Sequence, residues 1–154
     1  MMDEADRRII AEVQGGLSES MTPWADAARA AGVEVDELLR RLEAMRRTGV
    51  LRGVRAVLDQ RRLGLEGNVL VAWVVPEGRT DEVGRLFASR PEVSHCVLRE
   101  AASDWPYNLY TMIHTPSRER ADAVTDEMAA ASGITDHVRL ETLRELKKSP
   151  PRYF

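Results

Sequence analysis

The side chains best suited to acid–base and ligand-binding chemistry crowd into one ten-residue stretch, 105–114. The stretch holds one of the three Trp, two of the three Tyr and one of the three His of a chain that is 5% aromatic. A strand period of two gives it an apolar face (Leu109, Thr111, Ile113) and a mixed face (Asn108, Tyr110, Met112, His114). The mixed face joins titratable groups to large apolar surface, as ligand pockets do. The alternative is a half-buried strand whose outer face meets a partner subunit.

A second chemical signal is the predominance of arginine among the basic residues. Lys147 and Lys148 are the only lysines, so arginine supplies the other 20 of the 22 basic side chains. A guanidinium can hold a carboxylate through two parallel hydrogen bonds, whereas an ammonium acts as a point charge. The arginines therefore suit a ligand with several carboxylates, although the abundance of alanine favours codon bias as a plainer explanation.

The composition excludes several classes of protein. A net charge of −3 argues against a protein that coats nucleic acid indiscriminately, and no run of 18 apolar residues predicts a membrane span. The lone Cys96 excludes an internal disulfide framework and a multi-cysteine metal site. The sequence contains no His-x-x-x-His pair, phosphate-binding glycine loop or Gly-x-Ser-x-Gly turn. Because the charged residues 1–8 lack the apolar region of a signal peptide, we expect a cytoplasmic protein.

Residues 1–60 predict a winged helix-turn-helix domain. Capping signals and helical apolar spacing predict three helices, at about 3–14, 24–31 and 35–48, and residues 50–58 resemble the strand pair of a wing. The third helix would be the one that reads DNA. Its first turn carries Glu34, Asp36 and Glu37, which would face phosphates unfavourably. We therefore expect no DNA binding and interpret the motif as a scaffold.

Residues 61–154 predict a ferredoxin-like domain with the order β-α-β-β-α-β, which makes the fold class α+β. The expected elements are a strand at 68–75, a helix at 80–90, strands at 93–100 and 108–115, a helix at 117–132 and a strand at 136–147. The two helices cover one face of such a sheet and leave the other bare. A second protomer or a ligand must bury the bare face.

This order of domains resembles the Lrp/AsnC transcription regulators, as does the opening segment 3–10. Three blocks, at 49–64, 93–99 and 105–114, give a sharper resemblance to the siroheme decarboxylases, an enzyme family with the same architecture. The last block and residues 152–154 resemble the B-type subunit of the two-subunit enzyme. Asp59-Gln60 departs from the family, which often has Arg-His there. If that histidine takes part in the chemistry, its role passes here to the partner subunit or to His114.

The resemblance implies non-oxidative removal of the C12 and C18 acetate carboxyl groups of siroheme, giving 12,18-didecarboxysiroheme for heme biosynthesis. It implies no added cofactor, because the iron-containing tetrapyrrole is the substrate. It also implies a heterodimer with a homologous A-type subunit. A large apolar plate with eight carboxylates requires aromatic, methionine and arginine surface. The alternative is a transcription regulator of the Lrp/AsnC type that senses a small metabolite or a tetrapyrrole.

The resemblance also implies roles for particular residues. His114 and Tyr110 are the candidate catalytic acids, because an acid must protonate the carbon that loses carbon dioxide. The candidate substrate-binding residues are Arg52, Arg62, Arg99, Trp105, Tyr107, Asn108, Met112 and Arg152. We expect no protein-bound metal, and His114 or His95 is the candidate ligand of the substrate iron. The alternative for each is structural: a hydrogen-bonded histidine, aromatic packing or a solvated arginine.

Overall fold

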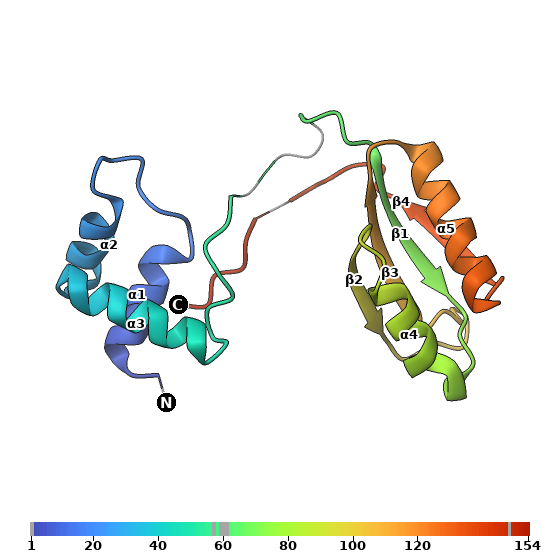
Figure 1. Ribbon diagram of the computed structural model, residues 1–154, viewed down its shortest axis with the longest axis horizontal. Helices are drawn as coiled ribbons and strands as arrows, with labels where there is room; N and C mark the ends of the chain where they lie inside the picture. Colours follow the sequence, from blue (N-terminus) through green and yellow to red (C-terminus); the bar gives the residue numbers. More distant parts are fainter. Residues whose placement is uncertain (1, 57, 59–61, 148) are drawn as a thin grey trace. The chain divides into compact units, whose positions relative to one another are not determined.

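The computed structural model describes residues 2–56, 58, 62–147 and 149–154 (Figure 1). The chain forms two compact units, one of Met1–Ala56 with Leu146–Phe154 and the other of Val57–Glu145. We had assigned the segment 146–154 to the second domain, whereas it folds with the first. The side-chain amide of Gln14 explains this, because it accepts from the Tyr153 backbone N–H at 2.8 Å and donates to the Phe154 carbonyl at 2.7 Å.

The first unit is built from three helices, α1 (Glu4–Val13), α2 (Pro23–Ala31) and α3 (Val35–Arg47). Helix α1 begins with the predicted capping box, in which Asp3 and Asp6 each accept from the other's backbone N–H. Helix α2 starts at Pro23 and ends at Gly32, whose φ of 68° is left-handed. Their apolar faces form a small core of Ile9, Ala28, Ala31, Leu38, Leu42 and Met45.

The strand pair expected at 50–58 is not formed by residues 50–56 and 58, and residue 57 lies outside the described residues. Leu51 donates its backbone N–H to the Met45 carbonyl at 3.1 Å and packs on the helical core. Val54 and Leu58 are 67% and 63% exposed. An isolated two-stranded hairpin is at best marginally stable in water. Alternating apolar residues therefore stabilise a hairpin only where they pack against another element.

The second unit has the predicted β-α-β-β-α-β order. Its elements are β1 (Gly67–Trp73), the short 3-10 helix η1 (Glu77–Arg79), α4 (Thr80–Ala88), β2 (Val93–Leu98), β3 (Leu109–Thr115), α5 (Arg118–Ser132) and β4 (His137–Glu141). The antiparallel sheet has the order β2-β3-β1-β4. Strand β4 ends at Glu141, opposite Val69 and six residues before the predicted 147. Because β1 has only Gly67 and Asn68 beyond Val69, it could not have paired with β4 as far as 147.

Helices α4 and α5 lie against the same face of the sheet (Figure 1). Val83 and Phe87 of α4 and Val124 and Met128 of α5 are buried there against the strands. Trp73 lies at the centre of this core, where its indole N–H donates to the Thr111 hydroxyl at 2.9 Å. Among the described residues of this unit, no helix lies on the opposite face, and we call it the open face. No helix among the described residues is long and apolar enough to cross a membrane.

Candidate functional site

The open face of the sheet carries the mixed face predicted for β3. Strand pairing fixes its rows: Asn68 is opposite His114, Leu70 is opposite Met112, and Ala72 is opposite Tyr110. Strands β4 and β2 extend these rows, through the pairs Leu70–Leu140, Ala72–Val138, Met112–His95 and Tyr110–Val97. The Leu70–Met112 pair therefore lies between two polar ends of the face, with Asn68 and His114 at one end and the Tyr110 hydroxyl at the other.

A β-bulge in β2 adds a residue to this end of the face. The pairing shifts between Val93 and His95, so Ser94 and His95 together stand opposite Met112. Strict alternation placed Val93 and His95 on one face. The bulge instead leaves Val93 and Cys96 packed on the core, while Ser94 and His95 are exposed beside His114.

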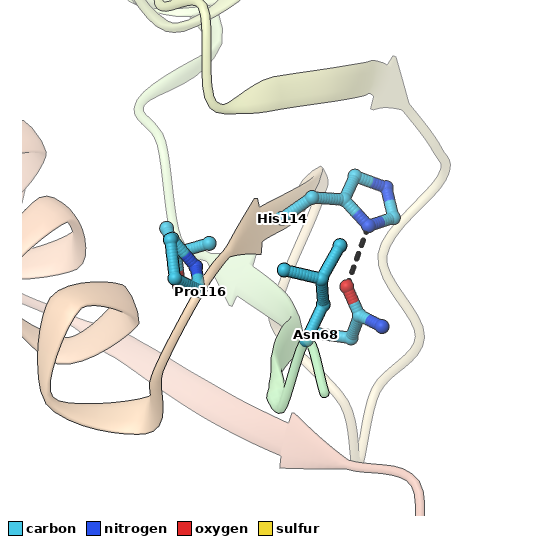
Figure 2. Close-up of a pocket in the computed structure, with 5 residues that line it drawn as sticks. Asn68, His114 and Pro116 are labelled. Atoms are coloured by element: carbon cyan, nitrogen blue, oxygen red, sulfur yellow. Dashed lines mark hydrogen bonds between the residues drawn. The ribbon is translucent and has the colours of Figure 1, made fainter. Parts of the chain in front are cut away.

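His114 is held at both ring nitrogens. Its Nδ1 lies 2.7 Å from Asn68 Oδ1, as Figure 2 shows, and its Nε2 lies 2.7 Å from Ser94 Oγ. The same Ser94 hydroxyl lies 2.9 Å from His95 Nδ1. One serine therefore connects two histidines. Neither Asn68 nor Ser94 was among the predicted site residues.

A shallow pocket opens beside His114 at the end of the sheet (Figure 2). It has a volume of about 250 Å³ and is lined by Leu65, Asn68, His114, Thr115 and Pro116. The pocket is far smaller than a tetrapyrrole, so it could hold a substituent of such a ligand rather than its ring. The backbone N–H of His114 donates to the Glu92 carbonyl at 2.9 Å, which ties this end of β3 to the start of β2.

Tyr110 and the loop before β3 form an aromatic cluster at the other end of the face. The Tyr110 hydroxyl accepts from the Trp105 indole N–H at 2.7 Å and donates to the Tyr107 carbonyl at 3.0 Å. The Trp105 and Tyr107 rings are 4.7 Å apart between centroids. Arg99 lies 5.8 Å from the centroid of the Tyr110 ring. The Tyr110 hydroxyl therefore helps to hold the loop. A catalytic role for Tyr110 remains a prediction.

Asn108 lies just before β3 and makes structural contacts. Its amide accepts from the Val75 backbone N–H at 2.9 Å and donates to the Val75 carbonyl at 2.8 Å. Both polar atoms of the side chain are therefore used to join β3 to the segment that follows β1. This is a reason to favour a structural role over the predicted substrate contact.

The predicted carboxylate-binding arginines are exposed but belong to different units. Arg52 and Arg152 lie in the first unit, and Arg62 and Arg99 in the second. Of these, Arg99 is tied to the open face through Tyr110. Met112 stands in the apolar middle of the face, between His95 and Leu70 in the strand pairing.

Cys96 lies on the core side of β2. Its thiol packs toward α4, with Sγ 3.6 Å from the Gly84 carbonyl. Burial raises the pKa of the Cys96 thiol, so it is a poor nucleophile near neutral pH. Within the described part of the chain, no group of three or more His, Cys, Asp or Glu side chains could hold a metal ion.

Helix α3, the helix that would read DNA, takes part in an ion cluster with the start of α1. Arg41 lies 2.8 Å from carboxylate oxygens of both Asp3 and Asp6 and 2.9 Å from Glu37. Hydrogen bonds to Asp3, Asp6 and Glu37 raise the pKa of Arg41 further above its already high value. The cluster directs this guanidinium to carboxylates within the unit and away from an external phosphate.

Comparison with known proteins first defines the class. Residues 62–147 match the family model of the AsnC-like ligand binding domain, and residues 6–52 match that of the siroheme decarboxylase NirDL-like HTH domain. The structure of E. coli AsnC, at 18% identity, has a TM-score of 0.78 and covers 99% of each chain, which shows a shared fold. The protein therefore has the Lrp/AsnC architecture.

Sequence relatives define the family more narrowly. The siroheme decarboxylase beta subunit of Methanosarcina barkeri is 33% identical over 98% of this chain and 99% of its own. That of Oleidesulfovibrio alaskensis is 36% identical over 98% and 96%. The crystal structure of siroheme decarboxylase NirDL with an iron-uroporphyrin III analogue matches at 30% identity and a TM-score of 0.67. The match covers 99% of this chain and 47% of that longer one. The chain belongs to the siroheme decarboxylase family.

Proposed function

We propose that this protein is a subunit of siroheme decarboxylase, a carboxy-lyase, and that it removes the C12 and C18 acetate carboxyl groups of siroheme. The match to beta subunits along nearly the whole chain carries this proposal. The open face supports it with an apolar middle, an aromatic cluster at one end and a hydrogen-bonded histidine at the other. Such a surface suits a flat apolar ring with polar substituents.

The reaction consumes one proton for each carboxylate that leaves. Breaking the bond between the methylene carbon and the carboxylate releases carbon dioxide and leaves an electron pair on the carbon, shared with the pyrrole ring. A proton then forms the methyl group. We assign this proton to His114, because imidazole donates and accepts protons near neutral pH. The pyrrole ring of the substrate delocalises the charge, so no added cofactor is required.

Binding of the substrate is assigned to the apolar rows and the arginines. Leu70 and Met112 offer an apolar surface to the ring, and Trp105 and Tyr107 offer an aromatic edge. Arg99 is the carboxylate-binding candidate tied to this face, and Arg52, Arg62 and Arg152 are further candidates. His95 and His114 share the Ser94 hydroxyl, so we assign both rings to proton transfer rather than to the predicted ligation of the substrate iron.

We further propose that the open face pairs with that of a homologous A-type subunit, which gives a heterodimer with two unequal sites. Four strands with Leu70, Met112, Val138 and Leu140 on one side leave apolar surface that a partner would cover. We place this activity in the cytoplasm, consistent with the lone Cys96 and its free thiol.

The test is anaerobic incubation of the purified complex with siroheme, followed by mass analysis. The expected product has lost two molecules of carbon dioxide. Siroheme that is bound but recovered unchanged would contradict the proposal and would favour a tetrapyrrole-sensing regulator. His114→Ala in the same complex tests the assignment of the proton donor separately from that of the reaction.

A further inference from the structure

We propose that Ser94 and His95 form a proton relay that reloads His114 between the two decarboxylations. The proposal rests on the proposed function, which requires two protons for each siroheme. His114 can hold one transferable proton at a time, so the second must arrive while the intermediate is still bound. His114 is half-buried, whereas Ser94 and His95 are exposed.

The relay follows from counting protons on one hydroxyl. Ser94 Oγ lies 2.7 Å from His114 Nε2 and 2.9 Å from His95 Nδ1. The Met112 carbonyl lies farther from this oxygen, at 3.5 Å. The hydroxyl has one hydrogen, which it donates to one of the two nearer nitrogens. The other nitrogen must then carry a hydrogen and donate to the oxygen. The protonation states of the two rings are therefore linked.

Asn68 sets the direction of the hydrogen bonds. Its Oδ1, 2.7 Å from His114 Nδ1, accepts and cannot donate. In neutral His114 the hydrogen is therefore on Nδ1, and Nε2 accepts from Ser94. Ser94 Oγ then accepts from His95 Nδ1–H. This leaves the lone pair of neutral His95 on Nε2, and His95 is exposed.

A proton that binds to His95 Nε2 can be passed on without any movement of the chain. The hydrogen on His95 Nδ1 moves to Ser94 Oγ, while the Ser94 hydrogen moves to His114 Nε2. One proton enters at the exposed ring and one appears on His114, and the charge is conserved. His95 is left neutral with its hydrogen on Nε2. Reorientation of the Ser94 hydroxyl and exchange of the His95 proton with solvent restore the first state.

The bulge in β2 is the structural feature that makes the relay. Without the extra residue, Ser94 and His95 would alternate to opposite faces of the sheet, and Ser94 would point to the core. With it, the hydroxyl stands between the two rings. We therefore assign Ser94 and Asn68 as positioning residues and His95 as the entry point of the proton.

The first test is nitrogen-15 NMR of the complex, with this chain labelled at histidine and measured at alkaline pH. The chain has three histidines, so substituting each with Gln assigns the spectrum. We expect His114 and His95 to carry their hydrogens on Nδ1. Ser94→Ala should return His95 to the Nε2–H form that free imidazole favours, and Ser94→Thr should keep Nδ1–H. A His114 with its hydrogen on Nε2, or a His95 unchanged in Ser94→Ala, would overturn the relay.

The second test follows the two decarboxylations separately under single-turnover conditions. Ser94→Ala also removes a contact that positions the His114 ring, so the first carbon dioxide should leave more slowly than in the wild type, by less than about 10-fold. The second should be slowed on the order of 10²-fold, the lower end of the contribution of a positioned proton donor. The monodecarboxylated intermediate should then accumulate, and Ser94→Thr should restore the second step. Ser89→Ala, at the end of α4, is the matched control with no expected effect.

The outcomes separate the relay from the function. Unchanged rates in Ser94→Ala, or equal slowing of both steps, would overturn the relay while the decarboxylase assignment stands. A wild-type complex that releases no carbon dioxide would refute the function and with it the purpose of the relay. The NMR result would still decide whether the hydrogen bonds run in the stated direction.

Discussion

At the scale of single residues, His114 is the side chain to which we assign the proton transfer. Its ring is fixed on both sides by Asn68 and Ser94, so its orientation does not depend on the substrate. His114→Ala should leave the chain folded and able to bind siroheme, while turnover falls by about 10²- to 10⁴-fold. Stopped-flow turnover and optical titration of siroheme measure the two effects. Near wild-type turnover would contradict the assignment, and lost binding with unchanged turnover at saturation would make His114 a binding residue.

Gly67 is required by close packing at the same end of the sheet. A Cβ there would overlap the Thr115 hydroxyl oxygen and the Ser117 carbonyl, and would lie 2.7 Å from the Thr115 carbonyl. Gly67→Ala should therefore lower the free energy of unfolding by about 1–3 kcal/mol, the usual cost of overpacking. Urea denaturation measures it. Gly84→Ala in α4, whose Cβ would meet nothing within 4 Å, is the control and should be neutral or stabilising. Equal stabilities of the two variants would contradict this prediction.

The residues that could be predicted from sequence differ in kind from those that could not. The alternation of β3 was sufficient to place Tyr110, Met112 and His114 on one face, because side-chain direction in a regular strand is a local property. Ser94 could not be predicted, because the bulge depends on how β2 pairs with β3. Asn68 was missed for the same reason. The contact of Asn68 with His114 depends on the pairing register between β1 and β3.

At the scale of elements, the Tyr110 hydroxyl holds two residues of the loop before β3, in addition to the backbone hydrogen bonds between Ala102 and Trp105. Tyr110→Phe removes the acceptor of Trp105 and the donor to Tyr107, each worth about 1 kcal/mol. We expect faster proteolysis within 100–107 and weaker siroheme binding, with turnover at saturation retained. Tyr153→Phe, on a side chain that is 70% exposed, is the matched control. A loss of turnover with the loop intact would instead support the catalytic assignment of Tyr110.

Helix α3 belongs to a helix-turn-helix, yet its contacts predict no sequence-specific DNA binding. Glu34 and Asp36 begin the helix, and Asp3, Asp6 and Glu37 surround Arg41. These carboxylates would repel phosphates. Selection from random DNA at roughly physiological salt is the measurement, and no defined site should be enriched. Recovery of a palindrome with salt-sensitive affinity would contradict this prediction.

The helices and strands could be predicted where an apolar face of the element packs on a core. The three helices of the first unit and the order of the second follow from apolar periodicity and capping signals. The ends of β4 and the expected strand pair at 50–58 were wrong, because a strand needs a partner. β1 offers only Gly67 and Asn68 beyond the Val69–Glu141 pair, and Val54 and Leu58 remain exposed.

At the scale of the whole molecule, the open face predicts how the enzyme assembles. Leu140 of β4 stands beside Leu70 on this face and is half-buried within the single chain. If the A-type subunit covers the face, Leu140→Asp buries a carboxylate without a partner. The desolvation cost is several kcal/mol, so the heterodimer should dissociate roughly 10²-fold more readily. Light scattering after size-exclusion chromatography, at a series of concentrations, measures this change.

Leu143 provides the matched control for assembly. It is the same residue type, three positions further along and 96% exposed, and it lies beyond the end of β4. Leu143→Asp should leave the heterodimer and its turnover unchanged, because the new carboxylate remains in water. Circular dichroism should show that both variants keep the fold, since Leu140 is on an edge strand and outside the helical core. If Leu140→Asp also left assembly intact, the partner would have to bind elsewhere. The open face would then be left to the substrate alone.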